Sequence, residues 1–113
     1  PEAPEEDVAA ARNKPLRSPL LVVAAAAVRE HPKVPAIEQI TATAAAVQNL
    51  WTQAHAMGFG MLWKTGPAAY SPRVKAALGL ADSDTIVGIL HLGTPAAPGI
   101  VREPDLAPVV RYL

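Results

Sequence analysis

A long helix between Pro35 and Gly58 is the feature of this sequence that does most to limit its fold. Pro35 suits the first residue of a helix, Glu38 falls in its first turn, and Gly58 suits the left-handed residue that closes it. Small residues along it let another backbone approach closely, which suits a sheet on one side and a second helix on the other. We therefore expect an interface helix. Its apolar positions recur at spacings of three and four: Ile37, Ile40, Ala44, Val47, Trp51 and Ala54.

Two apolar runs, one on either side of this helix in the sequence, are expected to form strands. Leu20–Val28 lacks period-two alternation, which is typical of a strand covered on both faces, although its four consecutive alanines leave a helix as an alternative. Thr85–Leu92 has the β-branched content of a central strand. Gly88 inside it indicates a close backbone approach.

Shorter elements complete the expected fold. Glu5–Asn13 is expected as a helix whose acidic residues precede its basic ones, an order that suits the helix dipole. After the long helix, a short apolar strand leads into a loop that ends at Gly66. Ser71–Pro72 is a cap and first-turn pair for a helix over Arg73–Leu78, which Gly79 is placed to end.

Composition predicts a thin core. The 113-residue chain holds 23 alanines and only five aromatic residues, so few large side chains are left to bury. An obligate partner surface is therefore expected. Four prolines between residues 95 and 108 predict an extended C-terminal arm over residues 94–113. The arm ends with the apolar Val109–Leu113, which suits docking on a neighbour through an exchange of arms between subunits.

Charge and cysteine content exclude several kinds of partner. Ten basic and ten acidic residues give a net charge of zero, so no long-range field favours nucleic acid or anionic lipid. The absence of cysteine excludes disulfides and thiolate metal sites and fits a reducing cytoplasm. Because the sequence has no uninterrupted apolar run of about 18 residues, no transmembrane helix is expected.

The sequence holds no self-contained catalytic group or metal-ligand set. His31, His55 and His91 lie in three different expected elements without ligand spacing, so we interpret them as structural or solvated histidines and predict no metal site. Asp82 and Asp84 are interpreted as turn residues, with a catalytic carboxylate pair as the alternative.

Six short motifs follow one another in this order: Lys33-Val34-Pro35, Glu38-Gln39, Gly58-Phe59-Gly60, Trp63-Lys64-Thr65-Gly66, Ile86-Val87-Gly88 and Leu92-Gly93-Thr94-Pro95. Their order and spacing resemble the nitroreductase family, in particular its small bacterial NAD(P)H nitroreductases. The resemblance implies an α+β fold with a mixed sheet flanked by helices, in an intertwined homodimer with swapped C-terminal arms and FMN at its interface. It also implies hydride transfer from NAD(P)H through the flavin to a nitro-aromatic, a quinone or a similar acceptor.

The same resemblance implies cofactor contacts but no catalytic side chain. In the family the loop that matches Trp63, Lys64, Thr65 and Gly66 lies along the flavin ring, so these four residues are expected to contact FMN. From the residues alone, a plain strand-to-helix loop with a buried tryptophan remains the alternative. Many relatives have arginine where this chain has Lys64, which keeps the charge but loses the planar fork. The segment that matches a nicotinamide-nucleotide site in relatives comprises Gln53, Ala54, His55, Ala56, Met57 and Gly58.

The resemblance further implies that residues 1–113 are the C-terminal part of a single nitroreductase-like domain. Residues 1–14 would be the end of a helix or a linker, and residues 94–113 the arm. The chain begins with Pro1, and the family's N-terminal arginine and serine residues that hold the FMN phosphate have no counterpart in it. Two functions stay open at this point: part of an oxidoreductase, or a non-catalytic dimerisation or flavin-binding module.

Overall fold

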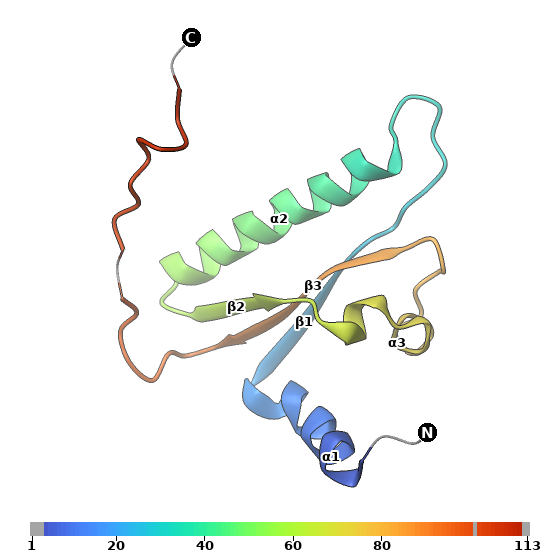
Figure 1. The fold of residues 1–113 in the computed structure, drawn as a ribbon, viewed down its shortest axis with the longest axis horizontal. Coiled ribbons are helices and arrows are strands. Elements are labelled where there is room, and N and C mark those ends of the chain that lie inside the picture. Colours follow the sequence, from blue (N-terminus) through green and yellow to red (C-terminus); the bar gives the residue numbers. More distant parts are fainter. Residues whose placement is uncertain (1–3, 101, 112–113) are drawn as a thin grey trace.

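The computed structural model describes residues 4–100 and 102–111, which form three strands, three α-helices and two 3-10 helices (Figure 1). In chain order these are α1 (Glu5–Asn13), η1 (Lys14–Arg17), β1 (Leu20–Ala26), α2 (Ala36–Ala56), β2 (Gly60–Lys64), η2 (Pro67–Tyr70), α3 (Pro72–Ala77) and β3 (Thr85–Gly93).

The three strands form one sheet in the order β1-β3-β2, and both neighbouring pairs are antiparallel. The expected central position of Thr85–Leu92 is confirmed, but the expected mixed sheet is wrong for the described residues. The cause is the place of β3. The crossover through α2 makes β1 and β2 run in the same direction, yet β3 lies between them, so these two strands never pair.

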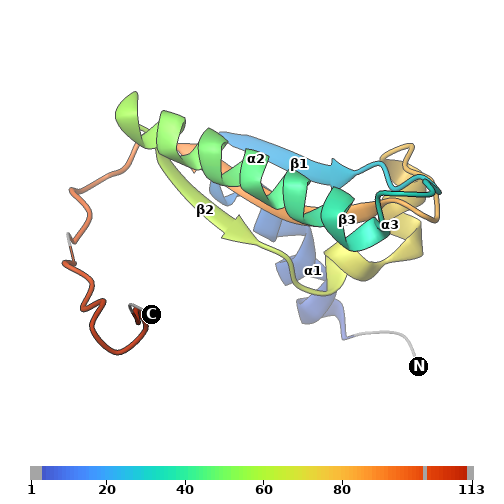
Figure 2. The same cartoon turned by 90° about the horizontal axis from the view of Figure 1, so that it is seen from above.

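Helix α2 covers one face of the sheet and contacts all three strands (Figures 1 and 2). Leu90 in β3 is fully buried beneath it, and Val47 of α2 is 3% exposed. The prediction of a long helix packed on a sheet is confirmed. Its other side faces no comparable helix within the described part of the chain.

The opposite face of the sheet is open. Register partners Leu21, His91 and Leu62 share one row across the sheet, and Leu62 is 50% exposed. Among the described residues, the short η2 contacts β3, and no α-helix other than α2 makes extensive contact with the sheet. The expectation that the strand at Leu20–Val28 is covered on both faces is therefore wrong within this chain: the strand ends at Ala26 and lies at the edge of the sheet.

The local signals for helix ends are confirmed. The Ser71 hydroxyl accepts a hydrogen bond from the Val74 amide at 3.4 Å at the start of α3. Gly79 ends that helix with φ of 70°, and the Leu80 amide returns to the Lys75 carbonyl at 3.0 Å. Helix α1 has the bounds predicted for it, whereas the two 3-10 helices were not predicted. Pro35 precedes α2 rather than forming its first residue.

The C-terminal arm leaves the sheet after Gly93, and Figures 1 and 2 both show it apart from the rest of the chain. Its described residues form no helix or strand, and Ile100 is 85% exposed. The described arm contains one turn, in which the amides of Val109 and Val110 bond to the Leu106 carbonyl at 3.1 and 3.0 Å. Tyr112 and Leu113, at its predicted apolar end, lie outside the described residues, and exchange of arms stays a prediction.

Replacing Leu90 with alanine should lower the free energy of unfolding by about 2–5 kcal/mol, because it leaves a cavity at the centre of the sheet. Urea unfolding followed by circular dichroism measures this. Leu16→Ala is the matched control, since Leu16 is 78% exposed and should change the unfolding free energy little. Equal losses in the two variants would contradict a core centred on Leu90.

Candidate functional site

The loop after β2 turns sharply at Gly66. Its φ of 72° and ψ of −178° lie in a region that essentially only glycine occupies, and Pro67 opens η2 directly after it. A Cβ built at Gly66 would meet no atom within 4 Å, so the backbone is open to solvent on that side. The turn predicted at Gly66 is confirmed, and the loop presents an accessible backbone.

The side chain of Trp63 points away from this open backbone and into the interface between α2 and the sheet. Its indole Nε1 donates a hydrogen bond to the Val87 carbonyl at 3.1 Å. Its ring meets the Trp51 ring of α2 edge-on, with centroids 6.5 Å apart. Gly88 makes room for it, because a Cβ there would lie 2.7 Å from Trp63 Cδ1. The indole is thus committed to packing, which leaves the Trp63 backbone for any ligand.

Lys64, Thr65 and Gly66 are exposed, in contrast to Trp63. Lys64 shares a sheet face with Leu62, two residues before it, so its side chain lies on the face opposite α2. Of the four residues expected to contact FMN, these three are the accessible ones.

The six residues expected to contact a nicotinamide nucleotide form the last turn of α2 and its end. The Phe59 amide bonds to the Ala54 carbonyl at 2.9 Å and the Gly58 amide to the His55 carbonyl at 2.9 Å, which is a Schellman ending. Ala54 is 5% exposed and faces the sheet. The side chains of Gln53, His55, Ala56 and Met57 are exposed, and Gly58 is in the left-handed conformation that the sequence predicted.

The two predicted contact sets lie at opposite ends of β2. Residues 53–58 precede the strand and residues 64–66 follow it. A five-residue strand spans about 13 Å at 3.3–3.4 Å per residue, so the two sets are separated by about that distance. Within one copy of the chain, residues 53–58 and residues 64–66 therefore do not lie together.

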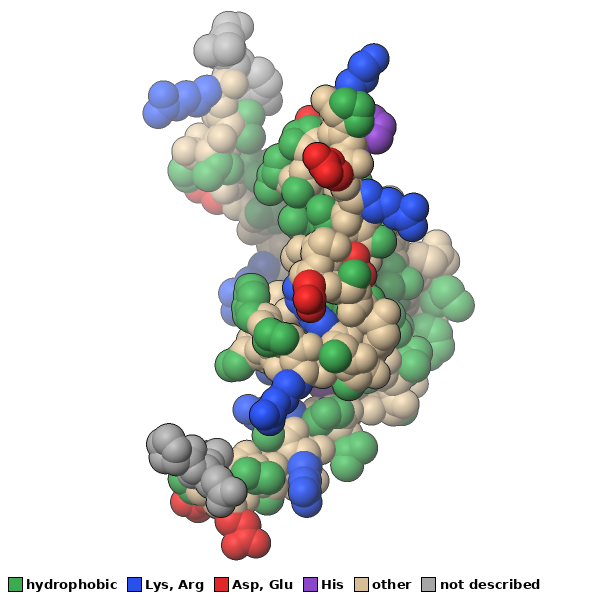
Figure 3. Space-filling model, turned by 90° about the vertical axis from the view of Figure 1, so that its right-hand side faces the viewer, with side chains coloured by type: hydrophobic (Ala, Val, Ile, Leu, Met, Phe, Trp, Pro, Cys, Tyr) green, Lys and Arg blue, Asp and Glu red, His purple; other side chains and the backbone are tan. Residues whose placement is uncertain are grey.

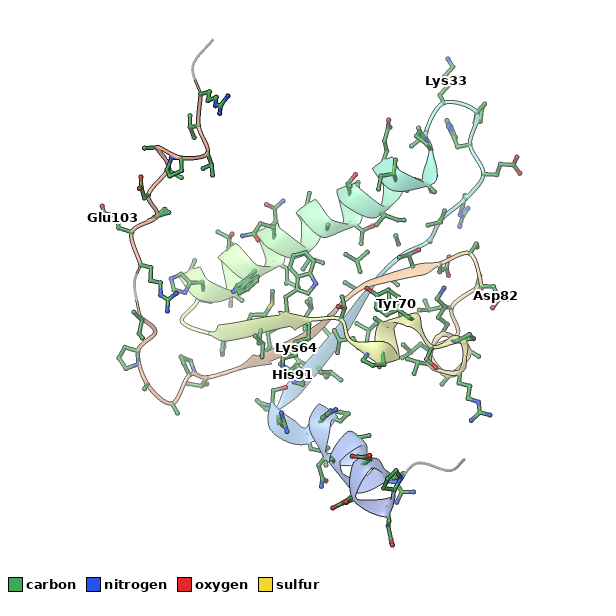
Figure 4. All side chains as sticks on the ribbon, viewed as in Figure 1. Lys33, Lys64, Tyr70, Asp82, His91 and Glu103 are labelled. Atoms are coloured by element: carbon green, nitrogen blue, oxygen red, sulfur yellow. The ribbon has the colours of Figure 1, made fainter. Side chains whose placement is uncertain are left out.

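A pocket of about 410 Å³ lies against the open sheet face, beside η1 and the ends of β2 and β3. Arg17, Lys64 and His91 line it together with apolar residues, and Figure 4 shows Lys64 and His91 on the neighbouring strands β2 and β3. The Ser18 hydroxyl lies 2.8 Å from His91 Nδ1. Sequence reasoning treated His91 as structural and missed this grouping. Alternation along β3 could have placed His91 on a face with Ile89, but Arg17 reaches the site only through the fold.

On the side of the molecule in Figure 3, basic and acidic groups are interspersed among apolar ones. The turn interpretation of Asp84 is supported, since its carboxylate accepts the Ala81 amide at 2.9 Å, and the Asp82 carbonyl accepts from Lys75 Nζ at 3.1 Å. Within residues 4–100 and 102–111, no three histidine or acidic side chains come together in a possible metal site. No helix in this range is long and apolar enough to cross a membrane.

Comparison with known proteins gives a consistent set of relatives. The sequence pattern of the "Nitroreductase family" matches residues 2–94. "Putative NAD(P)H nitroreductase YdjA" of Escherichia coli (strain K12) is 41% identical over 104 residues, which are 90% of this chain and 57% of the relative. "Putative NAD(P)H nitroreductase YfhC" of Bacillus subtilis (strain 168) is 34% identical over 67 residues, 58% of this chain and 34% of the relative.

Solved structures share the fold. The nitroreductase-like family protein from Bacillus cereus superposes with a TM-score of 0.73 at 28% identity, covering 98% of this chain and 62% of that one. The "Putative NADH dehydrogenase/NAD(P)H nitroreductase" from Parabacteroides distasonis ATCC 8503 superposes with a TM-score of 0.55 at 15% identity, and the match covers 99% of this chain and 87% of that one. At that identity the second match speaks for the fold alone.

Replacing Gly88 with alanine should lower the free energy of unfolding by about 1–3 kcal/mol, because the new methyl group would overlap the Trp63 indole. Tryptophan fluorescence should shift as well, since both tryptophans lie at this contact. Gly99→Ala is the control, because a Cβ at Gly99 would meet nothing within 4 Å. If Gly88→Ala unfolded like Gly99→Ala, the indole would not lie over Gly88.

Proposed function

This chain belongs to the nitroreductase family, and we propose that it forms part of an FMN-dependent oxidoreductase. The proposed reaction takes hydride from NAD(P)H and passes electrons through the flavin to a nitro-aromatic, a quinone or a similar acceptor. The chain spans 57% of the length of its YdjA relative, so the proposed activity is that of a longer protein that includes this chain. The cysteine-free composition favours a reducing cytoplasm as its compartment.

The observation that carries this proposal is the exposed backbone loop at Lys64, Thr65 and Gly66. A flavin supplies the hydride chemistry itself when bound, and what it asks of the protein is positioning and hydrogen bonds at the ring edge. The open backbone at Gly66 fits such a role, because no neighbouring atom occupies the space beside it. The Lys64 side chain adds a positive charge next to the loop.

The separation of the two contact sets supports a homodimer in the proposed enzyme. A second copy can bring its own residues 53–58 toward the 64–66 loop of the first, which one chain cannot do across the length of β2. Exposed apolar side chains at the end of α2 favour such a contact, since Met57 is 63% and Phe59 41% exposed. The exposed C-terminal arm gives further surface for exchange between subunits.

The proposal is tested by expressing this chain and the product of the intact gene side by side. The intact product should be yellow, retain FMN through gel filtration, and oxidise NADPH with a nitro-aromatic or quinone acceptor. If it is yellow but inert with every acceptor, the protein is a flavin-binding module. If it is colourless and does not take up added FMN, the flavin assignment is overturned.

Replacing Gly66 with valine should weaken FMN retention by the intact product about tenfold or more, because a β-branched residue at this φ and ψ strains the loop by about 1–3 kcal/mol. Fluorescence titration of FMN measures the change. Gly79→Val is a matched control: Gly79 also has a positive φ of 70° and open space, but it lies at the end of α3. Equal losses of FMN affinity in both variants would mean general destabilisation and would contradict the loop assignment.

A further inference from the structure

Two glycines paired across the sheet form the floor of the 410 Å³ pocket. Gly60 of β2 and Gly93 of β3 are register partners, and both line the pocket. Gly60 lies two residues before Leu62 in β2, and Gly93 lies two residues after His91 in β3. A side chain at either glycine would therefore project from the same open face of the sheet as Leu62 and His91. A Cβ on Gly93 would lie 2.9 Å from Pro19 Cδ, so Pro19 stands directly over this glycine. Pro95 lies beside Gly60 in the same way, 3.6 Å from where a Cβ would stand, so the two glycines let both prolines approach the sheet at this end of the pocket.

The charge of the pocket differs from that of the chain as a whole. Ten acidic and ten basic residues balance in the sequence, yet the described lining includes Arg17 and Lys64 and none of the acidic residues. Arg17 comes from η1 and Lys64 from the end of β2, so the fold brings together two cations that the sequence keeps far apart. Two cations around a concave surface favour an anion.

Hydrogen bonding fixes the third polar group of the pocket. The Ser18 hydroxyl has one proton to donate, and the Leu20 carbonyl lies within hydrogen-bond distance of it at 3.1 Å. The same hydroxyl lies 2.8 Å from Nδ1 of His91, and the tautomer of the imidazole sets which of the two donates. This contact orients the imidazole and leaves Nε2 as the ring nitrogen available to a ligand.

We propose that this pocket binds the oxyanion of a small organic molecule, with Arg17 and Lys64 as its charged partners. The volume exceeds what a bare phosphate or carboxylate fills, and the side chains of Leu62, Pro19 and Pro95 offer an apolar surface for the rest of the molecule. The backbone of Lys64 is part of the loop proposed to contact FMN, and the side chain of Lys64 lines this pocket. On the proposed function, therefore, the molecule is the electron acceptor, and the acceptor carries a carboxylate or a phosphate ester.

The test uses the 113-residue chain without flavin, so that its result does not depend on the flavin proposal. Chemical-shift changes in ¹H–¹⁵N NMR are followed during titration with 4-nitrobenzoate, 4-nitrophenyl phosphate, neutral 4-nitrobenzyl alcohol and inorganic phosphate. We expect 4-nitrobenzoate or 4-nitrophenyl phosphate to shift the amides of Ser18, Gly60 and Gly93. The tighter of the two tells whether the oxyanion is a carboxylate or a phosphate ester. Binding of the neutral alcohol with equal affinity, or of inorganic phosphate alone, would overturn the proposal.

Two variants test the residues. Arg17→Gln should raise the dissociation constant of the organic anion about tenfold, because it removes a charge-assisted hydrogen bond, whereas Arg73→Gln in α3 changes the same charge outside the pocket and should leave binding unchanged. Gly60→Ala adds a methyl group that lies 3.6 Å from the Gly93 carbonyl oxygen, an ordinary contact that the fold tolerates. Gly60→Ala should weaken binding of the organic anion, because the added methyl group narrows the floor of the pocket. Unchanged binding in Arg17→Gln and Gly60→Ala would place the ligand elsewhere.

Discussion

The contact of the Trp63 indole with Gly88 is the interaction on which the rest of this structure depends. One side chain links three elements, since it extends from β2, bonds to the Val87 carbonyl of β3 and meets Trp51 of α2. In a chain with so few aromatic residues, this cluster provides much of the large side-chain surface that the core has. The glycine is as necessary as the tryptophan, because any side chain at position 88 would occupy the indole's place.

The two faces of the sheet have different roles, and the same contact lies on one of them. The α2 face is filled by the row that includes Leu90 and Trp63 and serves stability. The opposite row, with Leu62 and His91, is left uncovered, and the pocket lies on it. The loop at Gly66 begins where β2 ends, so the packing of Trp63 also fixes where that loop leaves the sheet. Rigid placement of an exposed loop is what a binding site requires.

Local signals in the sequence predicted the elements well. Proline and glycine positions located the start and end of α2, and Ser71 with Gly79 located α3, because these residues act through backbone geometry alone. The β-branched content of Thr85–Leu92 also predicted a central strand, but the antiparallel pairing on both of its sides was beyond such signals. The insertion of β3 between β1 and β2 depends on packing between segments distant in the chain, and periodicity carries no information about neighbours. The same limit applied to Trp63, whose residue type fits a ligand contact and a core position equally, and to Arg17, which joins His91 only in the folded chain.

The central position of β3 also has a consequence for how this chain acquires its structure. Ser18 and His91, which meet at the edge of the sheet, are 73 residues apart in the sequence. Neither β1 nor β2 has a strand to pair with until β3 is present, because β3 is the only neighbour of each within the described sheet. During synthesis, α2 can form early from local contacts, but its apolar stripe stays uncovered until the chain has reached Gly93. Such non-local pairing slows folding and extends the time during which that stripe is open to aggregation or to a chaperone.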